Sequence, residues 1–117
     1  SRRHEFLLVE GAGGIMVPLS ERYTYLDLAQ AMRLPVVIVA RPGLGTINHS
    51  LLTVSVLKQR GFTVGGIVIN YSDGWKRGLA EKTSPSVIER LSDVRILGTV
   101  TYGMRDFDDI ARSVRLF

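Results

Sequence analysis

A carboxylate followed by glycines is the first feature of this chain that could do chemistry. Glu10 ends an apolar run at residues 6–9, and Gly11, Ala12 and Gly13 follow it directly. An apolar strand that ends in a carboxylate has the layout of a Walker-B acid, which holds Mg²⁺ beside nucleotide phosphates. The glycines would let the backbone approach a ligand without obstruction by Cβ atoms. Glu10 is therefore a candidate metal ligand, and the alternative is a carboxylate that caps a tight turn.

A second candidate site lies where the glycine-rich residues 43–45 lead into a helical pattern. The first turn of a helix presents unpaired backbone N–H groups and the positive end of the helix dipole, which together favour an anion. Gly45, Thr46 and Asn48 stand at this entrance. The alternative is structural: Thr46 is simply the N-cap, with Asn48 and His49 exposed in the first turn.

Polar groups also follow the third and fourth predicted strands. Asn70 and Tyr71 end the apolar run 64–69, and Thr101 and Tyr102 follow residues 96–100. In an open parallel sheet, ligands bind beyond the carboxyl ends of the strands. Glycine, hydroxyl, amide and carboxylate groups are thus predicted to collect at one edge.

Other catalytic patterns are missing from the sequence. The phosphate-cradling string Gly-x-x-x-x-Gly-Lys-[Ser/Thr] does not occur, and residues 11–17 contain no lysine. There is no metal-spaced pair of histidines and no Ser-His-Asp arrangement, so a zinc site and a hydrolase triad have little support. Taken alone, the sequence predicts a magnesium ligand but no phosphate-binding P-loop.

The elements that must position these groups alternate between strands and helices. Continuous β-branched runs predict strands buried on both faces, as in a parallel sheet covered by helices. Thr24 and Asp27 resemble a capping box, Gly61 is a predicted C-cap, and Ser84-Pro85 is expected to break the third helical region. The predicted strands are 6–9, 36–39, 64–70 and 96–100, and the predicted helices are 24–32, 47–60, a region ending at 91, and 106–115.

Within the second predicted helix, an inward-facing stripe is expected. It comprises Leu51, Leu52, Val54, Ser55 and Leu57. The alternation of elements predicts an α/β fold with a doubly wound, mostly parallel sheet and helices on both faces. Residues 1–117 are expected to form one domain, or part of one, without an internal boundary.

Composition agrees with a globular domain. The chain has 117 residues, 45% of them hydrophobic and 22% charged, with no cysteine and a formal net charge of +4. Disordered, disulfide-rich and membrane-spanning classes are therefore excluded, and the lack of cysteine fits a cytoplasmic protein. Basic residues cluster only in pairs such as Arg2-Arg3 and Lys76-Arg77, which argues against a nucleic-acid surface.

Six segments, in order and with natural spacing, resemble the dethiobiotin synthetase family. They are residues 9–14, 17–19, 34–37, 43–49, 51–53 and 66–70. The resemblance extends from about residue 5 to 102 and corresponds to the C-terminal half of a P-loop α/β fold. The chain begins without Met a few residues before a predicted strand, so a preceding portion with the P-loop is expected.

The resemblance implies a homodimeric ligase of biotin synthesis that uses ATP and Mg²⁺. Its substrate 7,8-diaminononanoate takes up CO₂ as a carbamate, ATP phosphorylates the carbamate, and the second amine displaces phosphate to close a ureido ring. By the same resemblance, Glu10 would bind Mg²⁺, and Gly11, Ala12 and Gly13 would border the phosphates. No catalytic residue is expected within this chain, and alone it is expected to be inactive.

The remaining site residues are also assigned by resemblance. Gly45, Thr46 and Asn48 would receive the substrate carboxylate across the dimer interface. Asn70 would hydrogen-bond adenine with Tyr71 beside it, since an amide both donates and accepts. Thr101 and Tyr102 would line the base, although the family usually has proline where Thr101 stands.

Two alternatives remain open at this stage. A cobyrinate-type amidating synthetase would share the glycine-rich element, but it lacks an entrance like residues 43–49. The other alternative is a regulatory or dimerisation module without a P-loop. A Gly-x-x-x-x-Gly-Lys-Thr string upstream of Ser1 would decide for the enzyme.

Overall fold

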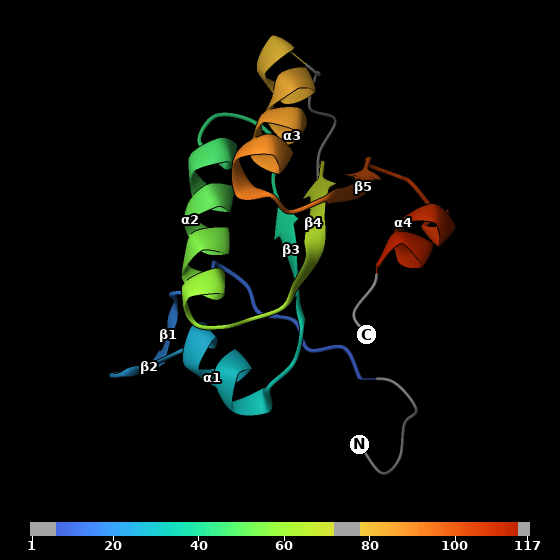
Figure 1. Ribbon diagram of the computed structural model, residues 1–117. Coiled ribbons are helices and arrows are strands. Elements are labelled where there is room, and N and C mark those ends of the chain that lie inside the picture. Colours follow the sequence, from blue (N-terminus) through green and yellow to red (C-terminus); the bar gives the residue numbers. More distant parts are fainter. Residues whose placement is uncertain (1–6, 72–77, 115–117) are drawn as a thin grey trace. The chain divides into compact units, whose positions relative to one another are not determined.

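The computed structural model describes residues 7–71 and 78–114. It divides into two compact units, residues 1–32 and 33–117, which are described separately below. Figure 1 labels the elements of both units. Whether the chain forms one domain without an internal boundary stays a prediction.

The first unit contains a short hairpin and a helix. Strands β1 (Pro18–Ser20) and β2 (Tyr23–Thr24) pair antiparallel, and helix α1 (Tyr25–Met32) follows at once. The Thr24 backbone N–H and hydroxyl both donate to Asp27 Oδ2, at 2.8 and 2.7 Å, and the Asp27 N–H donates back to Thr24 Oγ1 at 3.3 Å. The predicted capping box at the start of this helix is confirmed, whereas the hairpin was not predicted.

The second unit is a three-stranded parallel sheet with helices on both faces. Strand order is β3-β4-β5, and α2 and α3 lie on one side of the sheet with α4 on the other (Figure 1). This confirms the α/β class with a parallel sheet. The elements are β3 (Val36–Ala40), α2 (Thr46–Gln59), β4 (Val64–Asn70), α3 (Leu79–Ser92), β5 (Ile96–Val100) and α4 (Asp108–Ser113).

The core of this unit lies between the sheet and the helices α2 and α3. Ile67 and Ile69 of the central strand β4 pack in one cluster with Val54 of α2 and Ile88 of α3. All four side chains are buried, which removes apolar surface from water at about 25 cal/mol per Å². The two helices are also joined at their ends, because Lys58 Nζ donates to the Ser92 carbonyl at 2.8 Å.

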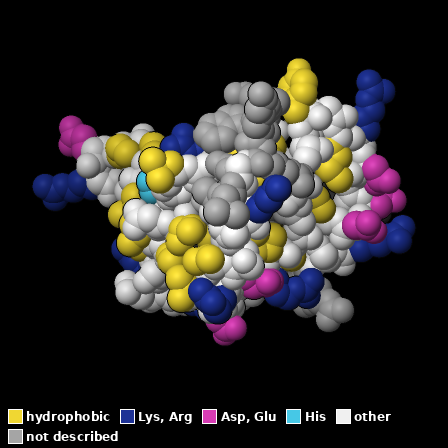
Figure 2. Space-filling model, turned by 90° about the horizontal axis from the view of Figure 1, so that it is seen from above, with side chains coloured by type: hydrophobic (Ala, Val, Ile, Leu, Met, Phe, Trp, Pro, Cys, Tyr) yellow, Lys and Arg dark blue, Asp and Glu magenta, His cyan; other side chains and the backbone are white. Residues whose placement is uncertain are grey.

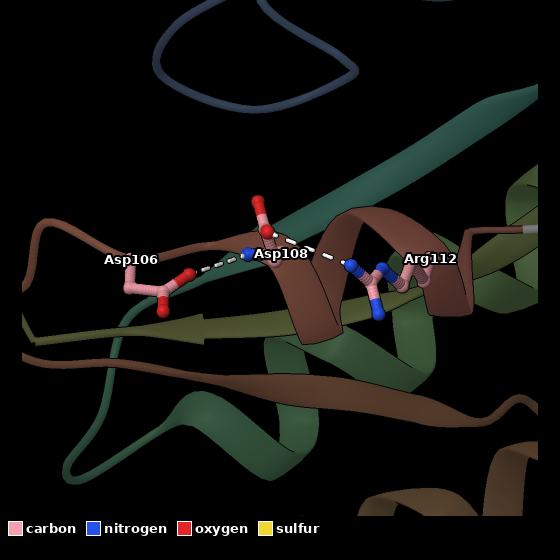
Figure 3. Close-up of polar contacts among 3 residues, drawn as sticks. All are labelled: Asp106, Asp108 and Arg112. Atoms are coloured by element: carbon pink, nitrogen blue, oxygen red, sulfur yellow. Dashed lines mark hydrogen bonds and ion pairs between the residues drawn. The ribbon is translucent and has the colours of Figure 1, made fainter.

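The opposite face of the sheet is covered by the short helix α4. Gly98 of β5 is required there, because a Cβ atom at this position would lie 2.6 Å from Ile110 Cγ1. At the start of α4 the Asp108 N–H donates to Asp106 Oδ1, and Arg112 lies 3.7 Å from Asp108 (Figure 3). Both members of that ion pair are highly exposed, so it adds little stability.

The first predicted strand does not form. Residues 7–10 have no regular secondary structure and their side chains are exposed. A strand needs a neighbour to satisfy its backbone N–H and C=O groups, and no strand in the described ranges pairs with this segment. The expectation of a strand at residues 6–9 was therefore wrong for 7–9, and Phe6 lies outside the described residues.

One expectation about the helices was wrong, and a second, the inward-facing stripe of α2, was confirmed only at Val54 and Leu57. Helix α3 continues through Pro85 instead of breaking at Ser84, although an interior proline removes a backbone hydrogen bond and crowds the preceding turn. In the same turn the Ser86 hydroxyl donates to the Thr83 carbonyl. In α2 the buried face is Thr46, Ser50, Val54 and Leu57, which follows the 3.6-residue period. Leu52, which is 57% exposed, and Ser55 lie outside that stripe.

Most predicted boundaries agree with the structure. The strands 64–70 and 96–100 are exact, and the helix predicted at 47–60 begins and ends one residue earlier. The C-cap is Arg60, one residue before the prediction, and Gly61 follows it with φ +78°, where glycine commonly ends a helix. The tail helix is shorter than predicted, and residues 115–117 lie outside the described part. Across the described chain, no helix has both the length and the apolar character that a membrane span requires.

Candidate functional site

The candidate site of the second unit is the edge where its parallel strands end. Strand β3 ends at Ala40, β4 at Asn70 and β5 at Val100, and the parallel pairing brings these ends to the same edge. Figure 2 views the molecule from the top of Figure 1, where β3 and β4 end and α2 begins, and shows hydrophobic side chains beside a histidine on this face. The sheet therefore positions two groups of predicted residues, one at the start of α2 and one after β4 and β5.

The start of α2 is shaped by Gly45. This residue is the N-cap with φ +89°, in the left-handed region that favours glycine, and no side chain caps the helix. The Thr46 N–H donates to the Gly43 carbonyl at 3.2 Å, and the His49 N–H donates to the Gly45 carbonyl at 2.9 Å. Within the described residues, no hydrogen bond is formed by the N–H groups of Ile47 and Asn48. The entrance thus offers two free donors at the positive end of a 14-residue helix.

Two hydroxyls of α2 are buried and have no hydrogen-bond partner. Thr46 is 4% exposed and Ser50 is 2% exposed, and neither Thr46 Oγ1 nor Ser50 Oγ is hydrogen-bonded in the described structure. The contrast lies on the same helix, where the Thr53 hydroxyl donates to the His49 carbonyl at 2.8 Å. Burying a hydroxyl without a hydrogen-bond partner lowers stability by roughly 1–3 kcal/mol. Two such hydroxyls near the start of one helix therefore point to a ligand.

His49 packs over Gly45. A Cβ atom at Gly45 would lie 3.3 Å from the imidazole Cε1, which is tighter than an ordinary contact. Helical side chains lean toward the N-terminus, and this direction places the ring of His49 at the entrance. Asn48 is exposed beside it. Gly45, Thr46 and Asn48 therefore stand at the start of α2, and their role in binding stays a prediction.

The second group lies at the ends of β4 and β5. Asn70 is aligned with Val100, and the Tyr71 N–H donates to the Val100 carbonyl at 2.8 Å, so the pairing continues past β4. Tyr102 is 77% exposed in a turn that the Met104 N–H closes onto the Thr101 carbonyl at 3.0 Å. The half-buried Asn70 and the exposed Thr101 thus stand at adjacent strand ends.

Tyr71 is placed differently from its neighbours. Its side chain is 5% exposed and belongs to the core cluster between the sheet, α2 and α3. A direct contact of Tyr71 with a nucleotide stays a prediction.

The glycine-rich segment belongs to the first unit. Glu10 is exposed, and Gly13 and Gly14 have φ values of +89° and +115°. Gly11 has a structural reason to be glycine, because a Cβ atom there would lie 3.0 Å from the Tyr25 ring. The backbone of this segment is thus open to a close approach at Gly14, where an added Cβ would meet nothing within 4 Å.

The donor set at Glu10 can be tested against a magnesium ion. The described residues contain no group of three or more His, Cys, Asp or Glu side chains placed to hold a metal. Mg²⁺ in nucleotide sites is usually bound by one or two carboxylates together with phosphate oxygens and waters. A single accessible carboxylate such as Glu10 fits that pattern, and Glu10 as a metal ligand stays a prediction.

One candidate residue was missed at the level of sequence. Ser50 lies four residues after Thr46 and shares its buried face. The spacing of four was the available signal, but the stripe was placed on Leu51 and Leu52 instead. Only the observed burial separates Ser50 from the exposed Ser55 on the same helix.

Comparison with known proteins finds one matching family model and several similar curated proteins. A family model described as an AAA domain matches residues 1–104. The chain is 58% identical over 96 residues to the ATP-dependent dethiobiotin synthetase BioD of Bacillus velezensis, covering 82% of this chain and 41% of that protein. It is 46% identical over 108 residues to the protein of the same name from Thermodesulfovibrio yellowstonii, covering 86% and 45%.

A third relative extends the match along almost the whole chain. The protein of the same name from Anaeromyxobacter sp. strain K is 44% identical over 113 residues, which cover 97% of this chain and 48% of that protein. The chain thus spans a little less than half the length of these curated relatives.

Proposed function

The chain belongs to the AAA-domain family and is related to the dethiobiotin synthetases, and on that premise we propose that it is the C-terminal part of an ATP-dependent ligase of biotin synthesis. The observation that carries the proposal is the entrance of α2, with two free N–H groups above a buried, unpartnered hydroxyl of Thr46. This arrangement suits a small anionic group. The carboxylate of a diamino acid is such a group.

The proposed reaction converts 7,8-diaminononanoate to dethiobiotin. One amine adds to CO₂ and loses a proton, which forms a carbamate. The carbamate oxygen accepts the γ-phosphoryl group of ATP, and ADP leaves. The second amine attacks the carbonyl carbon, phosphate departs, and the ureido ring closes. No acid–base residue is assigned to these steps within the chain, because positioning and charge neutralisation dominate phosphoryl transfer.

In this proposal the substrate carboxylate binds at Gly45, Thr46 and Asn48. The free N–H groups of Ile47 and Asn48 would donate to it, and a helix N-terminus favours an anion by about 0.3–1 kcal/mol. Binding here anchors the acid end of a long apolar substrate. The amines at the other end are thereby held in one place for the chemistry.

The nucleotide is proposed to bind at the ends of β4 and β5. Asn70 would hydrogen-bond the adenine edge, with Tyr71 beside it and Thr101 and Tyr102 along the base. Gly11, Ala12 and Gly13 would border the phosphates. Glu10 would hold Mg²⁺, which when bound neutralises charge on the phosphates.

The assembly is proposed to be a cytoplasmic homodimer whose active sites each use both subunits. A mixed dimer tests this arrangement, with Gly45→Val in one subunit and Glu10→Gln in the other, assayed at a diamino-acid concentration well below the wild-type KM. If each Glu10 works with the partner's Gly45, one site is intact and about half of the wild-type activity remains. Almost no activity would mean that both residues serve the same subunit.

The reaction itself is tested by mass spectrometry on the complete protein that carries this chain. With ATP, ¹³C-bicarbonate and 7,8-diaminononanoate, we expect labelled dethiobiotin and one ADP for each product molecule. Product formed only with glutamine or ammonia, and without bicarbonate, would instead identify an amidating synthetase. ADP release that does not depend on the diamino acid would contradict both.

A further inference from the structure

Ser50 is the feature of this chain that the proposed function leaves unexplained. The residue is only 2% exposed, and its hydroxyl has no hydrogen-bond partner in the described structure. Serine inside a helix commonly donates to the carbonyl four residues earlier. Thr53 on the same helix does so, with its hydroxyl 2.8 Å from the His49 carbonyl, but Ser50 does not.

Ser50 lies on the same buried face of α2 as Thr46, close to the start of the helix. It lies one turn after Thr46, and both belong to the buried face of the helix. Helical side chains lean toward the N-terminus and cover the preceding turn. The Ser50 hydroxyl is therefore expected on the same face as that of Thr46 and one turn further into the helix, with both leaning toward the entrance. The two hydroxyls and the two backbone N–H groups then offer four hydrogen-bond donors, a set that suits an anion.

We propose that Ser50 is a further specificity-determining residue, whose hydroxyl donates with that of Thr46 to the carboxylate bound at the α2 entrance. The inference rests on the proposed function and adds a residue to its acid-binding end. A carboxylate has two oxygens with about four acceptor positions, which matches the number of donors at the entrance. A neutral alcohol at the same place offers one oxygen and no charge. The pair therefore selects an ionised acid over a neutral end group.

A hydroxyl held for a ligand affects stability and binding in opposite directions. Removing a buried hydroxyl that has no partner in the free protein removes a desolvation cost, so Ser50→Ala is expected to keep or raise the melting temperature. The same change removes a donor from the bound complex. A merely structural serine would give a lower melting temperature and an unchanged KM.

The experiment compares Ser50→Ala with wild type and with the matched control Ser55→Ala, an exposed serine on the same helix. In the complete protein, KM and kcat are measured with 7,8-diaminononanoate and with its analogue in which an alcohol replaces the carboxylate. For Ser50→Ala we expect KM for the acid to rise at least fivefold and KM for the alcohol to change less than twofold. KM for ATP should stay constant, and Ser55→Ala should match wild type throughout.

Three results would overturn the inference. One is an unchanged KM for the acid in Ser50→Ala, which would mean that the hydroxyl faces a water or the protein. Another is an equal loss for the acid and the alcohol, which indicates a packing effect. The third is weaker inhibition by inorganic phosphate in Ser50→Ala while KM for the acid stays unchanged. That result would mean that the hydroxyl binds a phosphate and not the carboxylate. Wild-type turnover separates these results from failure of the proposed function, since a wild type that makes no dethiobiotin refutes the function itself.

Discussion

The conformation of Gly45 makes a quantitative prediction about substrate affinity. Its φ of +89° is strongly disfavoured for a β-branched residue, and a Cβ atom would lie 3.3 Å from the His49 ring. Gly45→Val should therefore shift the turn that aims the Ile47 and Asn48 N–H groups and should push the ring over the entrance. Both effects weaken carboxylate binding.

The magnitude can be separated into two parts. A left-handed conformation costs an L-residue about 1–2 kcal/mol, and this part appears as lower stability. The second part is the loss of aligned N–H donors, for which we expect at least a tenfold rise in KM for the diamino acid, or about 1.4 kcal/mol. KM for ATP should change far less, because the nucleotide is proposed to bind after β4 and β5.

Gly61 provides the matched control for this experiment. It follows the other end of α2 with φ +78°, and a Cβ atom there would meet nothing within 4 Å. Gly61→Val should therefore lose a similar amount of stability, measured as the free energy of unfolding in denaturant, with KM unchanged. The two variants are assayed in the complete protein by steady-state kinetics with each substrate varied in turn.

A role for Gly45 in carboxylate binding is refuted if Gly45→Val and Gly61→Val lose similar stability and have the same KM for the diamino acid. That result would mean that Gly45 serves only the fold of the helix entrance. A parallel rise in KM for ATP and for the diamino acid would also contradict it, because the change would then not be confined to the acid end.

Three further predictions concern other parts of the chain. Glu10→Gln should keep the fold, seen by circular dichroism, but lower turnover at limiting Mg²⁺ by orders of magnitude, because an amide is a poor ligand for this cation; near-normal turnover would remove the metal role. Asp27→Ala should destabilise the protein by about 1 kcal/mol through loss of the capping box, measured by urea denaturation, and no change would refute that contribution. Gly98→Ala should lower the melting temperature, and Ile110→Ala in the same chain should restore part of the loss, since the added Cβ meets that side chain; no rescue would place the strain elsewhere.

The sequence was informative wherever one local pattern decides the structure. The capping residues Thr24 and Asp27 and the β-branched run 64–70 each act over a few residues, and each is confirmed. Gly61 ends α2 within one residue of the predicted C-cap. The entrance at Gly45 was also predictable, because a glycine before a helical pattern is a strong signal of a turn with positive φ.

The sequence was less informative wherever distant partners decide. The run at residues 7–9 has strand composition, but strand formation depends on a neighbour that composition does not identify. In α2 the predicted stripe was right at Val54 and Leu57, but it omitted Thr46 and Ser50, which the helical period places on the same face. Small polar residues on that face concealed it, and the same residues form the proposed acid-binding pair.

Carboxylate binding at the start of α2 is tested most directly by a crystal structure of the complete protein with 7,8-diaminononanoate bound. The measurement is the distance from each carboxylate oxygen to the backbone nitrogens of Ile47 and Asn48 and to the hydroxyls of Thr46 and Ser50. We expect distances of about 2.7–3.2 Å to at least one amide nitrogen and one hydroxyl. A carboxylate bound away from the start of α2, with these four donors unchanged, would show that the helix entrance does not bind the acid.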